Sequence, residues 1–167
     1  DRVIMVNDET HVILSKKSIT GQNELPGNLM SIRDQNGAII ERWISTQEPH
    51  HIFGKLAAGE SYFLCEDKPQ KGYAYAESVM FTVKRENEIT SVEMVNDTTK
   101  IKIHKVDSSG RQLIGAVLRI LNMKGEVVIP DFTTGPTETI IEGQLEAGEK
   151  YILKEVESPE GLSLIHI

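Results

Sequence analysis

The stretch Val92-Glu93-Met94-Val95-Asn96-Asp97 decides the fold, because an earlier copy, Val3-Ile4-Met5-Val6-Asn7-Asp8, lies 89 residues before it (96 − 7). Successive side chains of an extended strand point to opposite faces, so Val92, Met94 and Asn96 share one face. An amide therefore ends an apolar stripe where another aliphatic side chain would be easier to bury. The stretch predicts a β-strand that carries one polar residue on its buried face.

Two longer blocks of sequence repeat at the same spacing of 89 residues. Residues 5–21 and 94–110 share seven identities in seventeen, and residues 54–66 and 143–155 share eight in thirteen. A common offset in separate blocks indicates a tandem duplication, and its length suits a whole small domain rather than one unit of a solenoid.

The duplication predicts how the chain divides. We expect residues 1–8 to be the last strand of a preceding repeat and residues 9–97 to be one complete unit. Residues 98–167 then form a second unit that stops before its last strands, so the chain is a window from a longer array.

The strands of each unit are short and are separated by glycine-rich turns, without a helical period. This pattern predicts an all-β fold in which each unit is an immunoglobulin-like β-sandwich. In the complete unit we expect strands at residues 10–16, 29–33, 38–45, 50–53, 61–66, 78–84 and 89–96.

Composition excludes several classes of function. With 18 basic and 25 acidic residues the net charge is −7, so neither nucleic acid nor an anionic membrane is an expected partner. The sequence has no apolar run of about 20 residues, so we expect no membrane insertion in this segment. Cys65 is the single cysteine and has no disulfide partner in the chain. The neighbours His50 and His51 should point to opposite faces of a strand, and we expect neither a metal nor a cofactor.

Three stripes of the complete unit run from apolar to polar along one strand face. A lysine, a glutamate and an asparagine end them: Val12, Leu14 and Lys16; Tyr62, Leu64 and Glu66; Val92, Met94 and Asn96. The second unit repeats two of the stripes: Ile101, Ile103 and Lys105; Tyr151, Leu153 and Glu155. Burying such polar groups unpaired costs several kcal/mol each, so they must meet one another or lie at the rim.

Two interpretations of these polar groups are open. In the first, they lie at strand ends, where the lysine reaches water and the glutamate forms a salt bridge with it. In the second, they react, because an apolar pocket lowers the pKa of an amine and raises that of a carboxylic acid. A neutral Lys16 is then a nucleophile, and a protonated Glu66 can bond the Asn96 carbonyl and pass a proton to departing ammonia.

Motifs spread over nearly the whole chain carry a family resemblance. They include Val12–Lys16, Glu24-Leu25-Pro26-Gly27, Ala58–Glu66, Gly72-Tyr73 and Met94–Asp97. With these motifs the sequence resembles the Cna-B or SpaA-type domains, the prealbumin-like β-sandwiches repeated in pilins and adhesin stalks of Gram-positive bacteria.

The resemblance implies an intramolecular isopeptide bond. It makes Lys16 the nucleophile, Asn96 the acceptor and Glu66 the catalytic acid of the first unit. In the second unit Lys105 and Glu155 match, while the partner asparagine lies beyond Ile167. Asn7 matches the acceptor of the preceding repeat.

The first unit departs from the family pattern beside its lysine. The usual Lys-x-Asp is kept in Lys105-Val106-Asp107 but becomes Lys16-Lys17-Ser18, which leaves the register of the nucleophile open by one residue. Alternation favours Lys16, because Lys17 would face away from Val12 and Leu14.

The resemblance also implies a function and a location. We expect structural stalk or spacer repeats of an extracellular, cell-wall-anchored adhesin or pilin-like protein, with neighbouring repeats as partners and host surface or matrix ligands bound through other domains. The self-cross-linking is a single turnover, so the chain is not expected to be an enzyme. The alternative is a module that binds carbohydrate or host matrix protein without the cross-link, which the low aromatic content of 5% disfavours.

Overall fold

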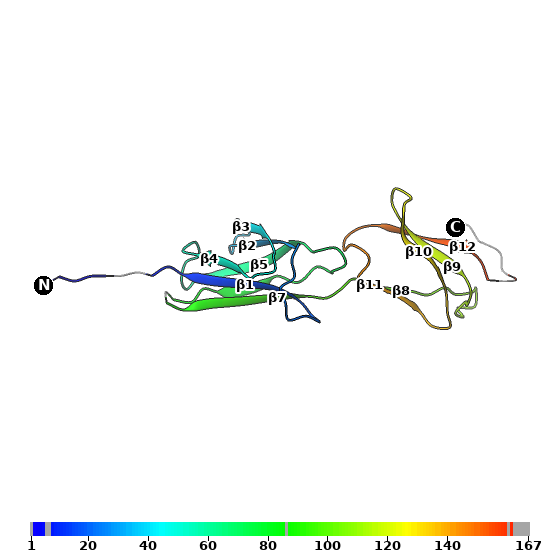
Figure 1. The fold of residues 1–167 in the computed structure, drawn as a ribbon, viewed down its shortest axis with the longest axis horizontal. Coiled ribbons are helices and arrows are strands. Elements are labelled where there is room, and N and C mark those ends of the chain that lie inside the picture. Colours follow the sequence, from blue (N-terminus) through cyan, green and yellow to red (C-terminus); the bar gives the residue numbers. More distant parts are fainter. Residues whose placement is uncertain (1, 6–7, 86, 160, 162–167) are drawn as a thin grey trace. The chain divides into compact units, whose positions relative to one another are not determined.

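The computed structural model describes residues 2–5, 8–85, 87–159 and 161, and it divides into two units, Asp1–Asp97 and Thr98–Ile167. Every helix or strand assigned in this described part is a β-strand (Figure 1), which confirms the all-β prediction. Accordingly, it holds no helix with the length and hydropathy to cross a membrane.

Unit 1 is a sandwich of two sheets. Its strands follow the predicted positions closely: β1 His11–Ser18, β2 Leu29–Arg33, β3 Ile39–Ile44, β4 His50–Phe53, β5 Ser61–Lys68, β6 Val79–Thr82 and β7 Ile89–Asn96. One sheet has the order β4-β1-β7 and the other the order β3-β2-β5-β6. Figure 1 shows β1 and β7, the first and last strands of the unit, running side by side.

The pairing of β1 with β7 is parallel, whereas β1 pairs with β4 in antiparallel fashion. The register sets Lys16 opposite Met94 and Ser18 opposite Asn96. A parallel pair needs a long crossover, and here the whole of the second sheet lies within that crossover. Lys16 and Asn96 therefore lie near one end of the unit although 80 residues separate them.

The core of unit 1 lies between the two sheets and follows the alternation of the sequence. β1, β5 and β7 each alternate buried and more exposed residues along their length. This period of two is what a strand with one covered face requires. The buried apolar residues form one cluster: Val12, Leu14, Met30, Ile32, Ile52, Leu56, Tyr62, Leu64, Phe81, Val83, Val92 and Met94.

The predicted hairpin between β2 and β3 turns at Asp34–Gly37. The Asp34 carboxylate accepts the backbone N–H groups of Asn36 and Ala38 at 2.8 and 2.9 Å. Gly37 has φ 81°, in the left-handed region that a glycine adopts without a steric penalty. Side-chain capping and one glycine therefore fix the turn.

Unit 2 repeats the first five strands of unit 1: β8 Lys100–Ile103, β9 Val117–Asn122, β10 Val127–Thr133, β11 Thr139–Glu142 and β12 Tyr151–Glu157. Its sheets have the orders β11-β8 and β10-β9-β12. The buried apolar cluster is correspondingly smaller: Ile103, Leu118, Ile120, Ile129, Ile141 and Leu145.

The predicted inward stripes of unit 2 are wrong at two positions. Ile101 is 37% exposed and Leu153 is 51% exposed, whereas their counterparts Val12 and Leu64 are buried. In unit 1, β7 pairs with β1 and β6 pairs with β5, so β1 and β5 each have a neighbouring strand on both sides. The described part of unit 2 has no counterparts of β6 and β7, so these side chains remain in contact with solvent.

The described N-terminal residues 2–5 have no strand assignment, and Val3, Ile4 and Met5 are strongly exposed. The prediction that residues 1–8 belong to a preceding repeat remains a prediction.

Candidate functional site

Three strands from two sheets bring Lys16, Glu66 and Asn96 together inside unit 1. Lys16 lies near the end of β1, Glu66 lies on β5 in the opposite sheet, and Asn96 ends β7. Their exposed fractions are 3%, 9% and 1%. The polar ends of the three predicted stripes therefore meet one another in the interior and do not lie at the rim.

The three side chains form a closed triangle of contacts. Lys16 Nζ lies 2.8 Å from Glu66 Oε1 and also donates to Asn96 Oδ1. Asn96 Nδ2 donates to the same Glu66 Oε1 at 2.7 Å. Each of these three polar side chains thus has partners, which offsets the cost of its burial.

The amide of Asn96 is turned differently from the prediction. Glu66 contacts the amide nitrogen, whereas the sequence predicts a contact with the carbonyl. The reason is complementary hydrogen bonding: an ammonium can only donate, so the carbonyl end faces Lys16, and a carboxylate accepts from the NH₂ end. The carboxyl group consequently lies against the atom that would depart as ammonia.

Burial lowers the pKa of the Lys16 ammonium below its ordinary value of 10.5. The hydrogen bond and the charge of Glu66 act in the opposite direction, but desolvation outweighs them. The interior of the sandwich therefore favours the neutral amine more than water does.

The segment between β5 and β6 holds two of the three side chains through its backbone. The Ala76 N–H donates to Glu66 Oε2 at 2.8 Å, and the Ala74 carbonyl accepts Asn96 Nδ2 at 3.1 Å. Ala74 N–H in turn donates to the carbonyl of Asp97 at 2.9 Å. Sequence reasoning missed these contacts, because alanine carries no side-chain signal for a backbone role.

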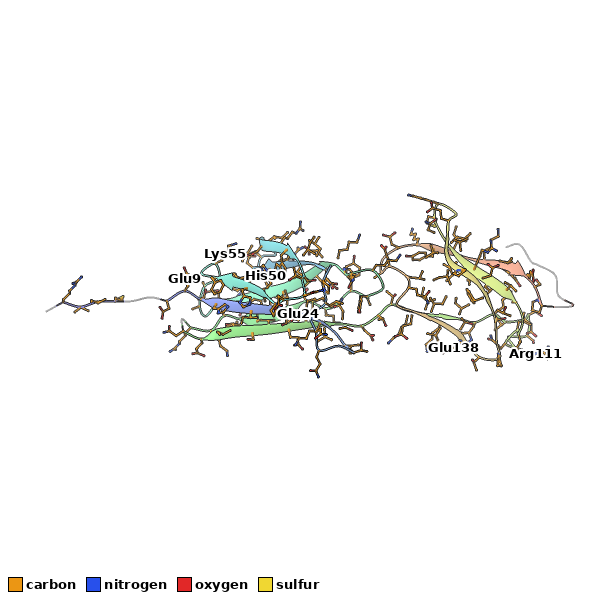
Figure 2. The ribbon with its side chains drawn as sticks, viewed as in Figure 1. Glu9, Glu24, His50, Lys55, Arg111 and Glu138 are labelled. Carbon is orange, nitrogen blue, oxygen red and sulfur yellow. The ribbon has the colours of Figure 1, made fainter. Side chains whose placement is uncertain are left out.

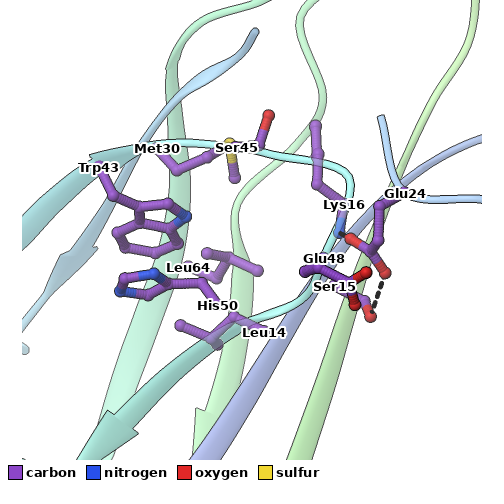
Figure 3. Close-up of a pocket in the computed structure, with 10 residues that line it drawn as sticks. All are labelled: Leu14, Ser15, Lys16, Glu24, Met30, Trp43, Ser45, Glu48, His50 and Leu64. Carbon is purple, nitrogen blue, oxygen red and sulfur yellow. Dashed lines mark hydrogen bonds between the residues drawn. The ribbon is translucent and has the colours of Figure 1, made fainter. Parts of the chain in front are cut away.

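Glu24, in the loop after β1, fixes the backbone beside the lysine. Its carboxylate accepts the Ser15 hydroxyl at 2.7 Å and the Lys16 N–H at 2.8 Å. Figure 3 shows Glu24 and Ser15 at the margin of a small cavity of about 10 Å³ between the sheets, which Lys16 also lines. This space holds about one water molecule. From the sequence, Glu24 (labelled in Figure 2) stands out only as part of a family motif.

Lys17, the alternative nucleophile by one residue, points away from the site. It forms an ion pair with Glu93 of β7 at 2.8 Å, and 29% of its side chain is exposed. Strand alternation therefore selects Lys16 in this structure.

Unit 2 brings together its own lysine and glutamate in a more exposed setting. Lys105 Nζ lies 3.2 Å from Glu155 Oε2, and the two side chains are 31% and 18% exposed. Asn7, the predicted acceptor of the preceding repeat, lies outside the described residues.

The two adjacent histidines point to opposite faces of β4. Figure 3 shows His50 stacked on Trp43, with ring centroids 4.2 Å apart. His50 is also hydrogen-bonded to Glu41, whereas His51 is hydrogen-bonded to His11 of β1. His50 and His51 therefore do not contribute to one common binding site.

Comparison with known proteins gives one family and several solved structures. The family model of the SpaA prealbumin-like fold domain matches residues 10–98 and again residues 99–166. No curated protein matches the chain.

Three solved structures illustrate the similarity. The TIE protein of Bacillus anthracis is 17% identical, with a TM-score of 0.49, over 91% of this chain and 32% of its own. A streptococcal ancillary pilin is 18% identical, with a TM-score of 0.49, over 94% of this chain and 56% of its own. The shaft pilin SpaA of Lactobacillus rhamnosus GG is 15% identical, with a TM-score of 0.47, over 92% of this chain and 89% of its own.

The chain thus spans about a third of the first of these proteins and just over half of the second. The family match, by contrast, runs through both units. The chain belongs to the family of SpaA prealbumin-like fold domains and contains two of them in tandem.

Proposed function

We propose that unit 1 forms an amide bond between Lys16 Nζ and Asn96 Cγ, with Glu66 as the acid, and that the chain is a stalk segment of a bacterial surface protein. The observation that carries the proposal is the buried triangle of Lys16, Glu66 and Asn96. A plain salt bridge would not need an amide that contacts both charged partners.

The reaction begins with a proton transfer from the Lys16 ammonium to the Glu66 carboxylate. Burial lowers the pKa of Lys16, which favours the resulting amine and carboxylic acid over the charged pair. The amine then attacks Cγ of Asn96, and the new carbon–nitrogen bond leaves a negative charge on Oδ1.

Glu66 next donates its proton to Nδ2 of Asn96, which it already contacts. The bond between Cγ and Nδ2 breaks, ammonia departs, and the carbonyl forms again. The extra proton on Lys16 Nζ returns to Glu66, so the products are one amide, one ammonia and a protonated carboxyl group. The backbone contacts of Ala74 and Ala76 hold both partners in place during these steps.

The bond would join the first and last strands of the unit, which suits a load-bearing role. A link that spans 80 residues adds about 4–5 kcal/mol of stability by loop entropy. Tension that enters through β1 would pass directly to the end of β7, so the rest of the unit stays folded. The resistance is kinetic as well as thermodynamic.

The location follows from the same considerations. A single cysteine leaves no internal disulfide, so an extracellular unit of this size gains from another covalent link. The family resemblance and the tandem duplication support a place on the surface of a Gram-positive cell, in a pilin-like or adhesin stalk with neighbouring repeats as partners.

Intact-mass spectrometry of the full chain tests the bond. We expect the wild type to be lighter than its sequence mass by one ammonia, and the Glu66→Ala variant to have its full sequence mass. Peptide mapping should recover Lys16 and Asn96 in one branched peptide.

Glu155→Ala is the matched control, because it removes the corresponding carboxylate of unit 2. It should keep the wild-type deficit of one ammonia. A wild type with its full sequence mass would overturn the proposal and leave the triangle as an ordinary buried polar cluster.

A further inference from the structure

The end of β1 that carries Lys16 has a neighbouring strand on one side only. β7 runs along all of β1, but the ladder between β1 and β4 ends where Leu14 stands opposite His50, the first residue of β4. Beyond that point the loop after β1 takes the place of β4, through an isolated antiparallel bridge between Lys17 and Glu24. The backbone of β1 beside the triangle therefore depends on this loop for its hydrogen bonds on the β4 side.

Both backbone polar groups of Lys16 are bound by this loop. The Lys16 N–H donates to Glu24 Oε2 at 2.8 Å, and the Lys16 carbonyl accepts the Leu25 N–H at 2.6 Å. The other carboxylate oxygen, Glu24 Oε1, accepts the Ser15 hydroxyl at 2.7 Å (Figure 3). One carboxylate thus bridges two consecutive residues of β1, and the second of them carries the amine of the triangle.

The loop that carries Glu24 is itself anchored in the interior of unit 1. Leu25 is buried, and its carbonyl accepts the Asn28 amide at 2.9 Å and the Ser45 hydroxyl at 2.7 Å. Asn28 is also fully buried. A carboxylate next to such an anchor has a defined position, so it can fix the position of the strand that it binds.

Unit 2 has the same loop with a different residue in the place of Glu24. Gln112 takes part in the corresponding isolated bridge, and the Leu113 N–H donates to the Lys105 carbonyl at 2.7 Å. The Gln112 amide donates to two carbonyls of the segment between β10 and β11 at 3.3 and 3.4 Å. The carboxylate therefore accompanies the buried lysine of unit 1, and an amide that bonds elsewhere accompanies the more exposed lysine of unit 2.

We propose that Glu24 is a positioning residue for the amide bond of unit 1. It holds the backbone of Lys16 where Nζ reaches the Asn96 amide, and it exchanges no proton with either partner. The inference rests on the proposed function, because it concerns the same bond. Attack within a folded chain is fast only while the reacting atoms are held in a near-attack geometry, so a displaced backbone should lower the rate steeply.

The rate at which the newly made chain loses ammonia tests this role. The full chain is produced by cell-free translation and denatured at intervals, and its intact mass gives the fraction that has lost one ammonia. Glu24→Ala should lower the first-order rate by about tenfold or more. It should still reach the wild-type extent, because all three members of the triangle remain.

Glu24→Gln separates hydrogen bonding from charge. Its amide oxygen can accept the Lys16 N–H and its NH₂ group can donate to the Ser15 hydroxyl, so the bridge is kept without the carboxylate charge. This variant should recover most of the rate that Glu24→Ala loses. A Glu24→Gln variant as slow as Glu24→Ala would overturn the inference, because the charge and not the position would then control the rate.

Thr10→Val is the matched control, because it removes one buried side-chain hydrogen bond just before the other end of β1. The Thr10 hydroxyl donates to the Leu56 carbonyl at 2.6 Å. Melting temperatures of Thr10→Val and Glu24→Ala, each measured in the unlinked Glu66→Gln chain, compare their effects on stability. Thr10→Val should keep the wild-type rate of ammonia loss, whereas an equal slowing would show that Glu24 acts through stability alone and would overturn the inference.

The remaining outcomes distinguish the inference from the proposed function. A wild-type rate in Glu24→Ala would overturn the role of Glu24 and leave the amide bond in place. A wild-type chain that never loses ammonia would overturn both.

Discussion

Lys16 and Glu66 belong to strands of opposite sheets, and yet their Nζ and Oε1 atoms lie 2.8 Å apart in the interior of the sandwich. The contact lies in the layer between the sheets that also holds the buried apolar cluster. A charged pair in such a place adds little to stability compared with apolar residues of the same volume. Its presence is more readily understood if the pair reacts.

Loss of the acid should reduce the stability of unit 1 by about 4 kcal/mol or more. Glu66→Gln keeps the shape of the side chain but removes the proton donor, so the link and its loop entropy are lost. Urea unfolding followed by the fluorescence of Trp43, the single tryptophan, reports on this unit. Glu93→Gln, at the exposed partner of Lys17, should cost less than about 1 kcal/mol. Equal losses in the two variants would contradict this expectation.

The unlinked unit should become more stable as the pH rises toward 10.5. In Glu66→Gln the buried Lys16 keeps a lowered pKa, because the two influences that raise it both come from Glu66. Between the folded pKa and 10.5 the unfolded chain binds the extra proton, so the free energy of unfolding rises with pH.

The double variant Glu66→Gln/Lys16→Met supplies the reference for this pH dependence. Its free energy of unfolding should rise less steeply over the same range. Identical slopes with and without Lys16 would show that other groups cause the dependence.

The stability of unit 1 should also depend on a further buried polar residue, Asn28. It is fully buried, and its amide donates to the Leu25 carbonyl and the Ser45 hydroxyl while accepting the Gln70 N–H. Asn28→Ala leaves the Gln70 N–H without its acceptor and removes the two hydrogen bonds that the amide donates, so it should cost roughly 3 kcal/mol in urea unfolding. Asn36→Ala, in the exposed β2–β3 turn, should cost under about 1 kcal/mol, and a similar loss there would argue against the role of burial.

The ion pair of unit 2 should contribute little to the free energy of unfolding of that unit. Lys105 and Glu155 are both partly exposed, so water screens their attraction. Lys105→Ala should change the unfolding free energy of unit 2 by less than about 1 kcal/mol, measured by hydrogen exchange of β9 amides. It should also leave the ammonia deficit of the chain unchanged, whereas Lys16→Ala should abolish it.

The strands of unit 1 could be predicted from sequence, whereas alternation left two places open for Lys16, Glu66 and Asn96, the rim or the interior. In a strand with one buried face, every second residue is apolar. A polar residue at the end of such a stripe must either find a partner or lie at the rim, because burying it unpaired is costly. Duplication made the pattern visible, because the same stripes occur twice.

Other parts of the site could not be predicted. The contacts of Ala74 and Ala76 are made by backbone atoms in a segment with no periodic pattern. The meeting of His11 and His51 depends on the register between β1 and β4, which alternation alone does not fix. The exposure of Leu153 depends on which strands pair beside β12. The sequence of β12 alone does not indicate its neighbours.

The parallel pairing of β1 with β7 has a consequence for extensibility. The two strands point the same way, so the chain enters unit 1 at one end and leaves at the other. Without a link, forced unfolding would release the 80 residues between Lys16 and Asn96, roughly 260–290 Å of contour length. The proposed amide would prevent the release of this contour length. A filament of such units would transmit force along its length without first lengthening by unfolding.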